Sequence, residues 1–375
     1  MYDNIHEGQY LIKLLASAVN NSPITPPPGE LSWVKLYHLA TFHKVANTAY
    51  YSLLKFPDSS IIPGSVWNKF SENAKKLSVQ EDLQQFEVVQ ILSNFEQNQI
   101  FCVPLIGYVM KALYPSPDMR YDSNVDFLVR EKDIHIIHTV MDSLGYTLIR
   151  STDSNFSYYK APNISIELST SLMPKNNEFY DYFNGICNNL TPQEGFQSIY
   201  SITNEDLYIY TLTYLAQHYA AGGTGIRAIL DVWVFLKHYG TDLNRELIAT
   251  ELNKLNLGLF SFYIEELAWI WFSGGDSFSD RSLYQEMESY LFSGSVGGDF
   301  KQPVKAALDS PEQPKYNNAV KDSPDTEVKR HLFPDLETMS VRYPILKKMP
   351  FLLPILWLAR LAGALLTKHM NGKDE

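Results

Sequence analysis

The sequence has few cysteines: only Cys102 and Cys187 occur in 375 residues. Two cysteines exclude a fold held together by a disulfide framework, and they fit a reducing compartment. The first ten residues, MYDNIHEGQY, also lack the basic segment and following apolar segment of a secretory signal. We therefore expect a cytoplasmic protein.

An excess of basic residues is missing as well. Lysine and arginine number 31 against 42 aspartates and glutamates, which gives a formal net charge of −11. General nucleic-acid binding needs a basic surface to meet the phosphates. The net charge therefore argues against a long nucleic acid as a partner, although a local basic pocket is compatible with this composition.

The sequence has no uninterrupted apolar run long enough for a membrane span, which takes about 20 residues. The most apolar stretch, at 351–366, is interrupted by Pro354 and Arg360. We expect this part of the tail to pack on the protein or on a partner. Peripheral membrane contact through an interfacial helix is the alternative.

The residues that are present predict a globular chain, since 45% are hydrophobic and 13% are aromatic. We expect an α+β fold, with a small mixed-sheet core flanked by N-terminal and C-terminal helical parts. The expected segments are a helical part at 1–97, the core at 98–170, a second helical part at 171–293, a loop or linker at 294–330, and an apolar tail at 331–375.

Hydrophobic periodicity supports this division. Apolar residues at helical spacing predict helices at 7–19, 31–55, 66–77, 79–97, 204–221, 225–239, 245–255 and 259–272. Between these two groups, short apolar or alternating runs predict strands at 100–107, 124–130, 147–150, 156–161 and 164–169. Two helices are expected inside the core, at 108–114 and 131–146. The second ends at Gly145, a residue suited to a left-handed cap.

Polar side chains inside these apolar strands are the candidate functional groups. Asn124 and Asp126 are two residues apart on one predicted strand, so they point to the same face. Glu167 lies in another apolar strand. A buried charge is costly without a partner, and carboxylates are hard oxygen ligands of the kind that Mg²⁺ takes. Upstream, Gly107 and Lys111 lie where a strand turns into a helix, a place where backbone N–H groups can meet phosphate.

The chain resembles the bacterial uncharacterised nucleotidyltransferase family of the polymerase-beta-like nucleotidyltransferase superfamily. The matching stretches are LSWVKLYHLATFHKV (31–45), YPSPDMRYDSNVDFLV (114–129), DSLGY (142–146), IELS (166–169), QHYAAGGTGIRAILDVW (217–233) and YPILKKMPFLLPILWLAR (343–360). They are scattered over nearly the whole chain. The most specific part is the block with Tyr-Pro, an arginine and the Asp-x-Asp position.

The resemblance implies roles for the core residues. Asn124 stands at the family's first metal-binding aspartate, Asp126 at its second, and Glu167 at its third acid. Arg120 matches the arginine of the block. The implied cofactor is Mg²⁺ or Mn²⁺, with a nucleoside triphosphate as substrate.

Further matches lie in the C-terminal helical part. Arg227 and Asp231 match an Arg-x-x-x-Asp pair, and His218 matches a histidine just before it. Each match also has a plainer interpretation. Arg227 and Asp231 would form an ordinary i,i+4 ion pair, His218 would be a hydrogen-bonded core residue, and Lys111 and Arg120 would be solvated cations.

Three residues depart from the family pattern. Asn124 replaces an acid, Ile106 stands where a lysine is common before the glycine, and Ser169 stands where a histidine is common. An amide has nearly the shape of a carboxylate but no charge, so Asn124 preserves the fold and weakens cation binding.

The expected function is metal-dependent transfer of a nucleotidyl or phosphoryl group from a nucleoside triphosphate to an acceptor hydroxyl, weakened or silenced by Asn124. The acceptor would be a small molecule, a sugar or a peptide. A catalytically silent relative that binds nucleotide or a partner protein is the second hypothesis. A peripheral scaffold acting through the apolar tail is the third.

Overall fold

A computed structural model describes residues 5–27, 29–187, 189–220, 225–273 and 281–292. The predicted linker at 294–330 and the apolar tail at 331–375 lie outside the described residues. Among the residues that are described, no helix combines the length and the apolar character needed to cross a membrane.

The N-terminal part is helical, as the periodicity predicts. It contains α1 (Ile5–Asn20), α2 (Trp33–Phe42), α3 (Ala46–Leu53) and α4 (Gly64–Gln97), with a 3-10 turn at Ser59–Ile61. The predicted apolar stripe of α1 is buried, and it includes Leu11, Leu14 and Leu15. Ser32 caps α2, because its hydroxyl accepts the backbone N–H of Lys35 at 3.4 Å.

Residues 31–55 form two helices rather than the single one predicted. The chain breaks between α2 and α3, where Lys44 adopts a left-handed φ of 57°. The break turns the side chain of His43 into the protein, where it is buried and accepts the backbone N–H of Ile226 at 3.3 Å. Burial lowers the pKa of His43 to about 4. His43 is therefore a packing residue.

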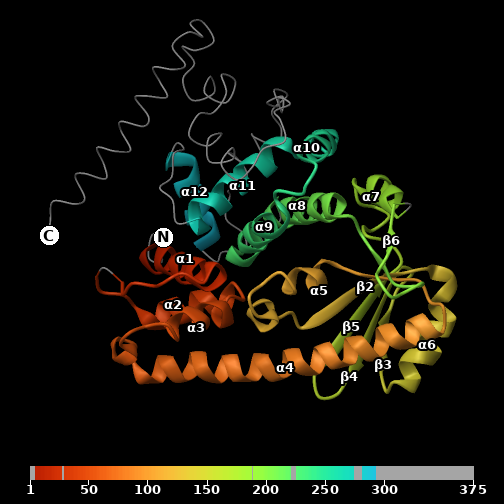
Figure 1. Ribbon diagram of the computed structural model, residues 1–375, viewed down its shortest axis with the longest axis horizontal. Coiled ribbons are helices and arrows are strands. Elements are labelled where there is room, and N and C mark those ends of the chain that lie inside the picture. Colours follow the sequence, from red (N-terminus) through yellow and green to blue (C-terminus); the bar gives the residue numbers. More distant parts are fainter. Residues whose placement is uncertain (1–4, 28, 188, 221–224, 274–280, 293–375) are drawn as a thin grey trace, which may run out of the picture.

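Helix α4 also differs from the prediction, because the helices expected at 66–77 and 79–97 form one continuous helix of 34 residues. Its first half contributes Val66 and Phe70 to a core shared with the other helices. Its second half contributes Val88 and Phe95 to a separate core beneath the sheet. Figure 1 shows α4 running under both parts of the molecule.

The core contains a five-stranded sheet with the strand order β1-β2-β5-β4-β3. Strands β2 and β5 are parallel, and the other neighbouring pairs are antiparallel. The elements are β1 (Cys102–Pro104), α5 (Ile106–Lys111), a 3-10 turn (Pro117–Arg120), β2 (Asn124–Val129), a 3-10 turn (Glu131–Asp133), α6 (Ile134–Ser143), β3 (Thr147–Ser151), β4 (Asn155–Lys160) and β5 (Ile164–Ser169). Gly145 follows α6 with φ 82°, as the predicted cap requires.

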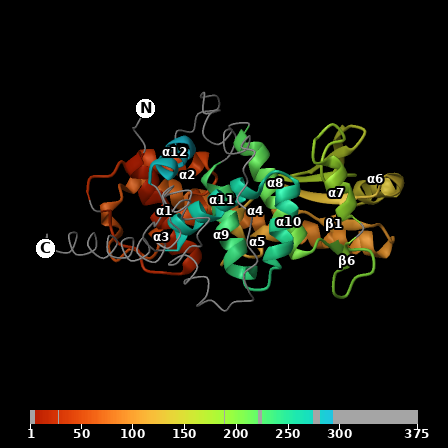
Figure 2. The ribbon, with the colours of Figure 1, turned by 90° about the horizontal axis from the view of Figure 1, so that it is seen from above.

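The second helical part includes a short two-stranded ribbon. It comprises α7 (Tyr180–Ile186), β6 (Thr191–Pro192), β7 (Tyr200–Ser201), α8 (Asn204–Ala220), α9 (Ile226–Tyr239), α10 (Arg245–Lys254), α11 (Gly258–Phe272) and α12 (Arg281–Phe292). Residues of α1, α9, α11 and α12 share one hydrophobic core. Described helices that precede the sheet and described helices that follow it thus form one body, and the sheet lies to one side of it (Figures 1 and 2). The fold is α+β, as predicted.

The sheet has one apolar face and one polar face. Apolar residues of β2, β4 and β5 pack against α4 and α6 in the core beneath the sheet, among them Phe127, Ile166 and Leu168, which are 0% exposed. Because strand side chains alternate, the intervening residues point to the other face. Those residues are the polar ones that the sequence singles out.

Phe127 and Phe86 offer a matched test of this arrangement. Phe127 is fully buried beneath the sheet, whereas Phe86 on α4 is 61% exposed. We expect Phe127→Ala to lower the free energy of unfolding by about 3–5 kcal/mol, because it opens a cavity in a packed core. Phe86→Ala should change it by about 0.5 kcal/mol or less. Denaturant titration of both variants is the measurement, and similar losses would contradict the assignment of the two faces.

Candidate active site

The two predicted acids lie side by side on the polar face of the sheet. Asp126 of β2 and Glu167 of β5 are direct partners in the parallel ladder. Neighbouring strands are about 4.8 Å apart, so the two carboxylates project from adjacent positions to the same side. Glu167 is held by Ser157 of β4, whose hydroxyl donates to Oε2 at 2.7 Å. The sheet thus presents two oriented carboxylates.

Asn124 lies next to this pair. Its side-chain Nδ2 donates a hydrogen bond to Oδ1 of Asp126 at 2.9 Å. A carboxylate at position 124 has no hydrogen to donate and would add a second negative charge at this distance. In this chain the amide therefore stabilises the charged form of Asp126 without adding to the charge of the site.

The environment of Asp126 nevertheless favours its protonated form. Burial, followed by the negative charges of Asp122 and Glu167, raises the pKa of Asp126 to about 6. The hydrogen bond from Asn124 opposes this shift and is outweighed. A group of carboxylates that repel each other in a partly desolvated place is stabilised by a bound cation.

Gly107 has no side chain at the point where the backbone passes these acids. A Cβ at this position would lie 3.5 Å from Oδ2 of Asp122 and 3.6 Å from Oδ2 of Asp126. The carbonyl of Gly107 accepts a hydrogen bond from Nη1 of Arg120 at 3.0 Å. Any larger residue would bring its side chain up to both carboxylates, so glycine keeps this approach to the acids open.

Arg120 is placed differently from the solvated or phosphate-binding cation that the sequence suggests. It is 4% exposed and forms two parallel hydrogen bonds with the carboxylate of Asp231 on α9, each 2.9 Å long. Tyr114 donates to the same carboxylate at 2.7 Å. Burial alone would lower the pKa of Arg120, but Asp231 and Asp122 raise it overall. Arg120 therefore joins the core to the helical body.

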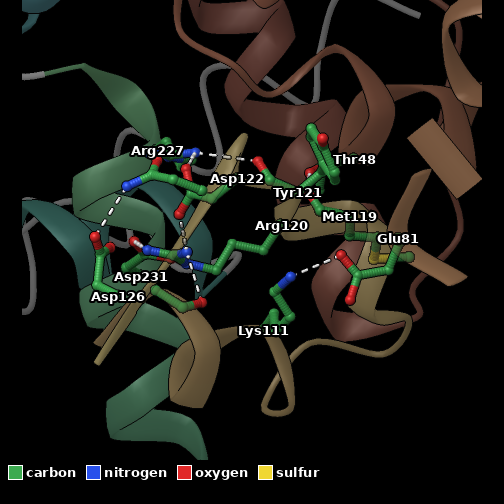
Figure 3. A network of polar contacts seen from close by, with 12 residues as sticks. Thr48, Glu81, Lys111, Met119, Arg120, Tyr121, Asp122, Asp126, Arg227 and Asp231 are labelled. Atoms are coloured by element: carbon green, nitrogen blue, oxygen red, sulfur yellow. Dashed lines mark hydrogen bonds and ion pairs between the residues drawn. The ribbon is translucent and has the colours of Figure 1, made fainter. Parts of the chain in front are cut away.

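Asp122, which no sequence motif marks, links two arginines. One oxygen accepts from Arg120 at 2.5 Å and the other from Arg227 of α9 at 2.7 Å. Burial would raise the pKa of Asp122, but the two guanidinium groups outweigh it and hold this pKa below its usual value. Figure 3 shows the carboxylate between the two arginines. Arg227 and Asp231 thus pair with core residues, not with each other as a plain helical pair would.

Lys111 points away from the acids, toward α4. Its Nζ lies 2.7 Å from Oε2 of Glu81 and 2.6 Å from Oε1 of Gln84, and the side chain is buried (Figure 3). Burial lowers the pKa of Lys111, against the opposing effect of Glu81. In this structure Glu81 and Gln84 of α4 are the partners of this ammonium group, and a phosphate-binding role for Lys111 stays a prediction.

Helix α8 places an aromatic face beside the acids. Tyr210, Tyr214 and His218 follow each other at four-residue spacing, and the rings of Tyr214 and His218 are 4.2 Å apart. Burial and the nearby charges of Asp126 and Asp122 raise the pKa of Tyr214, whose side chain is still 46% exposed. His218 lies on the solvent-facing side of this row and is not a core histidine. The repeated spacing of these three residues is the signal that sequence reasoning missed.

The donor set fits a divalent cation in part. Among the described residues, no three His, Cys, Asp or Glu side chains gather closely enough to hold a metal ion. Asp126 and Glu167 supply two carboxylates, and Asn124 supplies an amide oxygen if its side chain turns. These are hard oxygen ligands, and Mg²⁺ commonly completes its shell with phosphate and water.

The two arginines that hold Asp122 should differ in their effect on stability. Replacing Arg120 with methionine leaves the buried carboxylate of Asp231 without its cation, a loss of about 3–5 kcal/mol in the free energy of unfolding. Arg227→Met should cost about 1–2 kcal/mol, because Asp122 keeps Arg120 and the Arg227 side chain is 21% exposed. Urea titration of both variants measures this difference. Equal losses in the free energy of unfolding would mean that Arg120 is not the principal link between the core and α9.

Comparisons with known proteins show which family this chain resembles. The profile of the family described as "Uncharacterised nucleotidyltransferase" matches residues 29–273. The comparison with curated proteins gives no match. Among solved structures, the antibiotic-resistance factor ANT(2'')-Ia is similar at 10% sequence identity, over 48% of this chain and 97% of that chain, with a TM-score of 0.36.

That structural likeness is too distant to carry an argument about chemistry. The family profile, in contrast, covers more than half of the chain, and it includes β1 to β5, the acids of the sheet and the arginine-bearing helix α9. The chain belongs to the uncharacterised nucleotidyltransferase family.

Proposed function

We propose that this chain transfers a nucleotidyl group, or a phosphoryl group, from a nucleoside triphosphate to the hydroxyl of an acceptor, and that Asn124 makes the transfer slow. The observation that carries the proposal is the pairing of Asp126 with Glu167 on one face of the sheet, directly beside Gly107. Two-carboxylate platforms of this kind suit phosphate chemistry, because a cation held on them neutralises charge on the transferring group.

The residues have distinct proposed roles. Asp126 and Glu167 would hold Mg²⁺ or Mn²⁺, with the oxygen of Asn124 as a neutral third ligand. Gly107 leaves room for the phosphates. Arg227 would contact them, since its side chain is partly exposed and lies next to the acids.

Glu167 also suits proton transfer. Its Oε2 accepts from Ser157, and Oε1 has no hydrogen-bond partner among the described residues. This oxygen would accept the proton of the acceptor hydroxyl as the acceptor oxygen bonds to phosphorus and the leaving phosphate departs. His218 and Tyr214 would line the substrate from α8. Arg120 and Asp231 are positioning residues, because they hold the Gly107 carbonyl and α9 in place.

A second candidate function is nucleotide binding without turnover. It is favoured by one observation, the hydrogen bond from Asn124 to Asp126. This bond occupies an oxygen that a cation would need, and the amide brings no charge to hold a second ion.

Substituting Asn124→Asp separates the two. Without a cation, we expect the variant to melt below the wild type, because the hydrogen bond is replaced by a carboxylate next to Asp126. With Mg²⁺, the variant should recover this loss, bind the ion at least about tenfold more tightly, and release pyrophosphate or phosphate faster from a nucleoside triphosphate. Calorimetry with Mg²⁺ and a coupled phosphate assay are the measurements.

Asn163→Asp is the matched control for this substitution. Asn163 is an exposed residue of the turn between β4 and β5. It adds the same charge away from the paired acids and should change neither Mg²⁺ affinity nor turnover. Strong Mg²⁺-dependent activity of the Asn124 protein, unimproved by aspartate, would contradict the role given to the amide.

The raised pKa of Asp126 gives a pH test. An unfolded aspartate titrates near 3.9, whereas Asp126 titrates at about 6 in the folded protein. Protonation of Asp126 therefore stabilises the folded protein. This contribution to the free energy of unfolding is full below about pH 4 and is lost as the pH rises through about 6. Without a cation, Asp126→Asn should melt above the wild type at pH 8, and this difference should shrink toward pH 4.

Mg²⁺ should reverse the order of the two melting temperatures at pH 8, so that the wild type melts above Asp126→Asn. Cation binding needs the charged carboxylate, so Mg²⁺ should raise the melting temperature of the wild type at pH 8 and have little effect at pH 4.5 or on Asp126→Asn. Asp153→Asn, which removes an exposed acid, is the control and should follow the wild type. The account fails if Mg²⁺ stabilises Asp126→Asn and the wild type equally.

A further inference from the structure

The row of polar side chains that begins at Asp126 continues beyond Glu167. Glu167 of β5 is paired with Ser157 of β4, and Ser157 is paired with Arg150 of β3. Cross-strand partners point to the same face of a sheet. Asp126, Glu167, Ser157 and Arg150 therefore form one line across β2, β5, β4 and β3, on the face opposite α4 and α6; Ser157 in this line is buried, and Arg150 is exposed.

Arg150 is a different kind of cation from the others near the site. Lys111, Arg120 and Arg227 each pair with a carboxylate. Arg150 is exposed, and within the described part of the chain its side chain has no ion pair or hydrogen bond. Its guanidinium is therefore available to a ligand that lies along the row.

Hydroxyl and amide groups flank this line on the same face. The neighbouring rows, in register with Asn124 and with Leu128, carry Ser165, Tyr159, Thr147, Ser169 and Asn155. Such groups both donate and accept hydrogen bonds. A ligand rich in hydroxyl groups can satisfy them, whereas an apolar ligand would leave them desolvated and unpaired.

The two sides of Asp126 are not equivalent. On the side of β1 lie Gly107 and the arginine-linked Asp122, and the missing side chain of Gly107 leaves room for a phosphate chain. On the side of β5, the polar face extends over three strands. The second substrate therefore has its space on the side of β5, β4 and β3.

We infer that the acceptor is a polyhydroxylated compound with an anionic group, and that it lies along this row with its reacting hydroxyl at Glu167 and its anion at Arg150. The inference rests on the proposed function. Two strand spacings separate β5 from β3, about 10 Å, so the anion and the reacting hydroxyl are about a disaccharide's length apart. Arginine pairs with carboxylate or phosphate through parallel hydrogen bonds, which sets the charge of the acceptor.

Three disaccharide derivatives of one size test the charge. Lactobionate is anionic, lactitol is neutral, and 1-amino-1-deoxylactitol is cationic. We expect the full-length wild type to bind lactobionate about tenfold more tightly than lactitol in titration calorimetry, and the cationic compound most weakly. In Arg150→Gln the preference should fall to within about twofold, and Arg150→Lys should retain part of it because a single charge remains.

Lys132→Gln is the control, because it removes another exposed cation of the same domain that lies off the row. It should leave the preference unchanged. Binding of none of the three compounds, equal binding of all three, tightest binding of the cationic one, or an unchanged preference in Arg150→Gln would each overturn the inference. Arg150 would then be a solvated charge of the kind that keeps edge strands from pairing.

Nucleotide binding, measured on the same samples, distinguishes this failure from that of the proposed function. ATP with Mg²⁺ should bind wild type, Arg150→Gln and Lys132→Gln alike, since Arg150 is remote from Gly107. If ATP binds and the disaccharides show no preference for the anion, only the acceptor assignment fails. If ATP does not bind at all, the proposed function fails with it.

Discussion

The buried pair between Arg120 and Asp231 is the interaction on which the geometry of the site depends. Its two parallel hydrogen bonds join the turn before β2 to α9, and the same guanidinium also holds the carbonyl of Gly107 and the carboxylate of Asp122. A buried arginine needs all of these acceptors to offset its desolvation. One side chain thus sets the positions of the glycine, of the second arginine and of the helical wall beside the acids.

The acids of the sheet, in contrast, have other negative charges as neighbours. Arg120 and Asp231 satisfy each other, whereas Asp126 faces Glu167 and Asp122, so its charged form is disfavoured. Asn124 relieves part of this repulsion by donating a hydrogen bond. Local stability and cation affinity therefore compete at this position, because the charge that would attract a second ion would also repel Asp126. The amide favours the stability of the cation-free protein.

Much of the fold follows from local patterns in the sequence. The apolar stripe of α1, the Gly145 stop and the strand at Ile164–Ser169 are all set by nearby residues, and each was predicted. The partners of the cations were not predictable in this way. Lys111 meets Glu81 from 30 residues upstream, and Arg120 meets Asp231 from 111 residues downstream. Periodicity shows which face of a helix is apolar, but not which distant charge lies opposite a cation.

Helix α4 has a mechanical consequence. At 1.5 Å per residue its 34 residues span about 51 Å, and it is embedded in the helical core at one end and in the core beneath the sheet at the other. A hinge between the two bodies would have to bend or break this uninterrupted rod. Large rotations of the sheet against the helical body are thereby opposed, so the acids of the sheet and the helices beside them keep their relative positions. Selection among substrates would then depend on fit to a rigid template, more than on closure around whatever has bound.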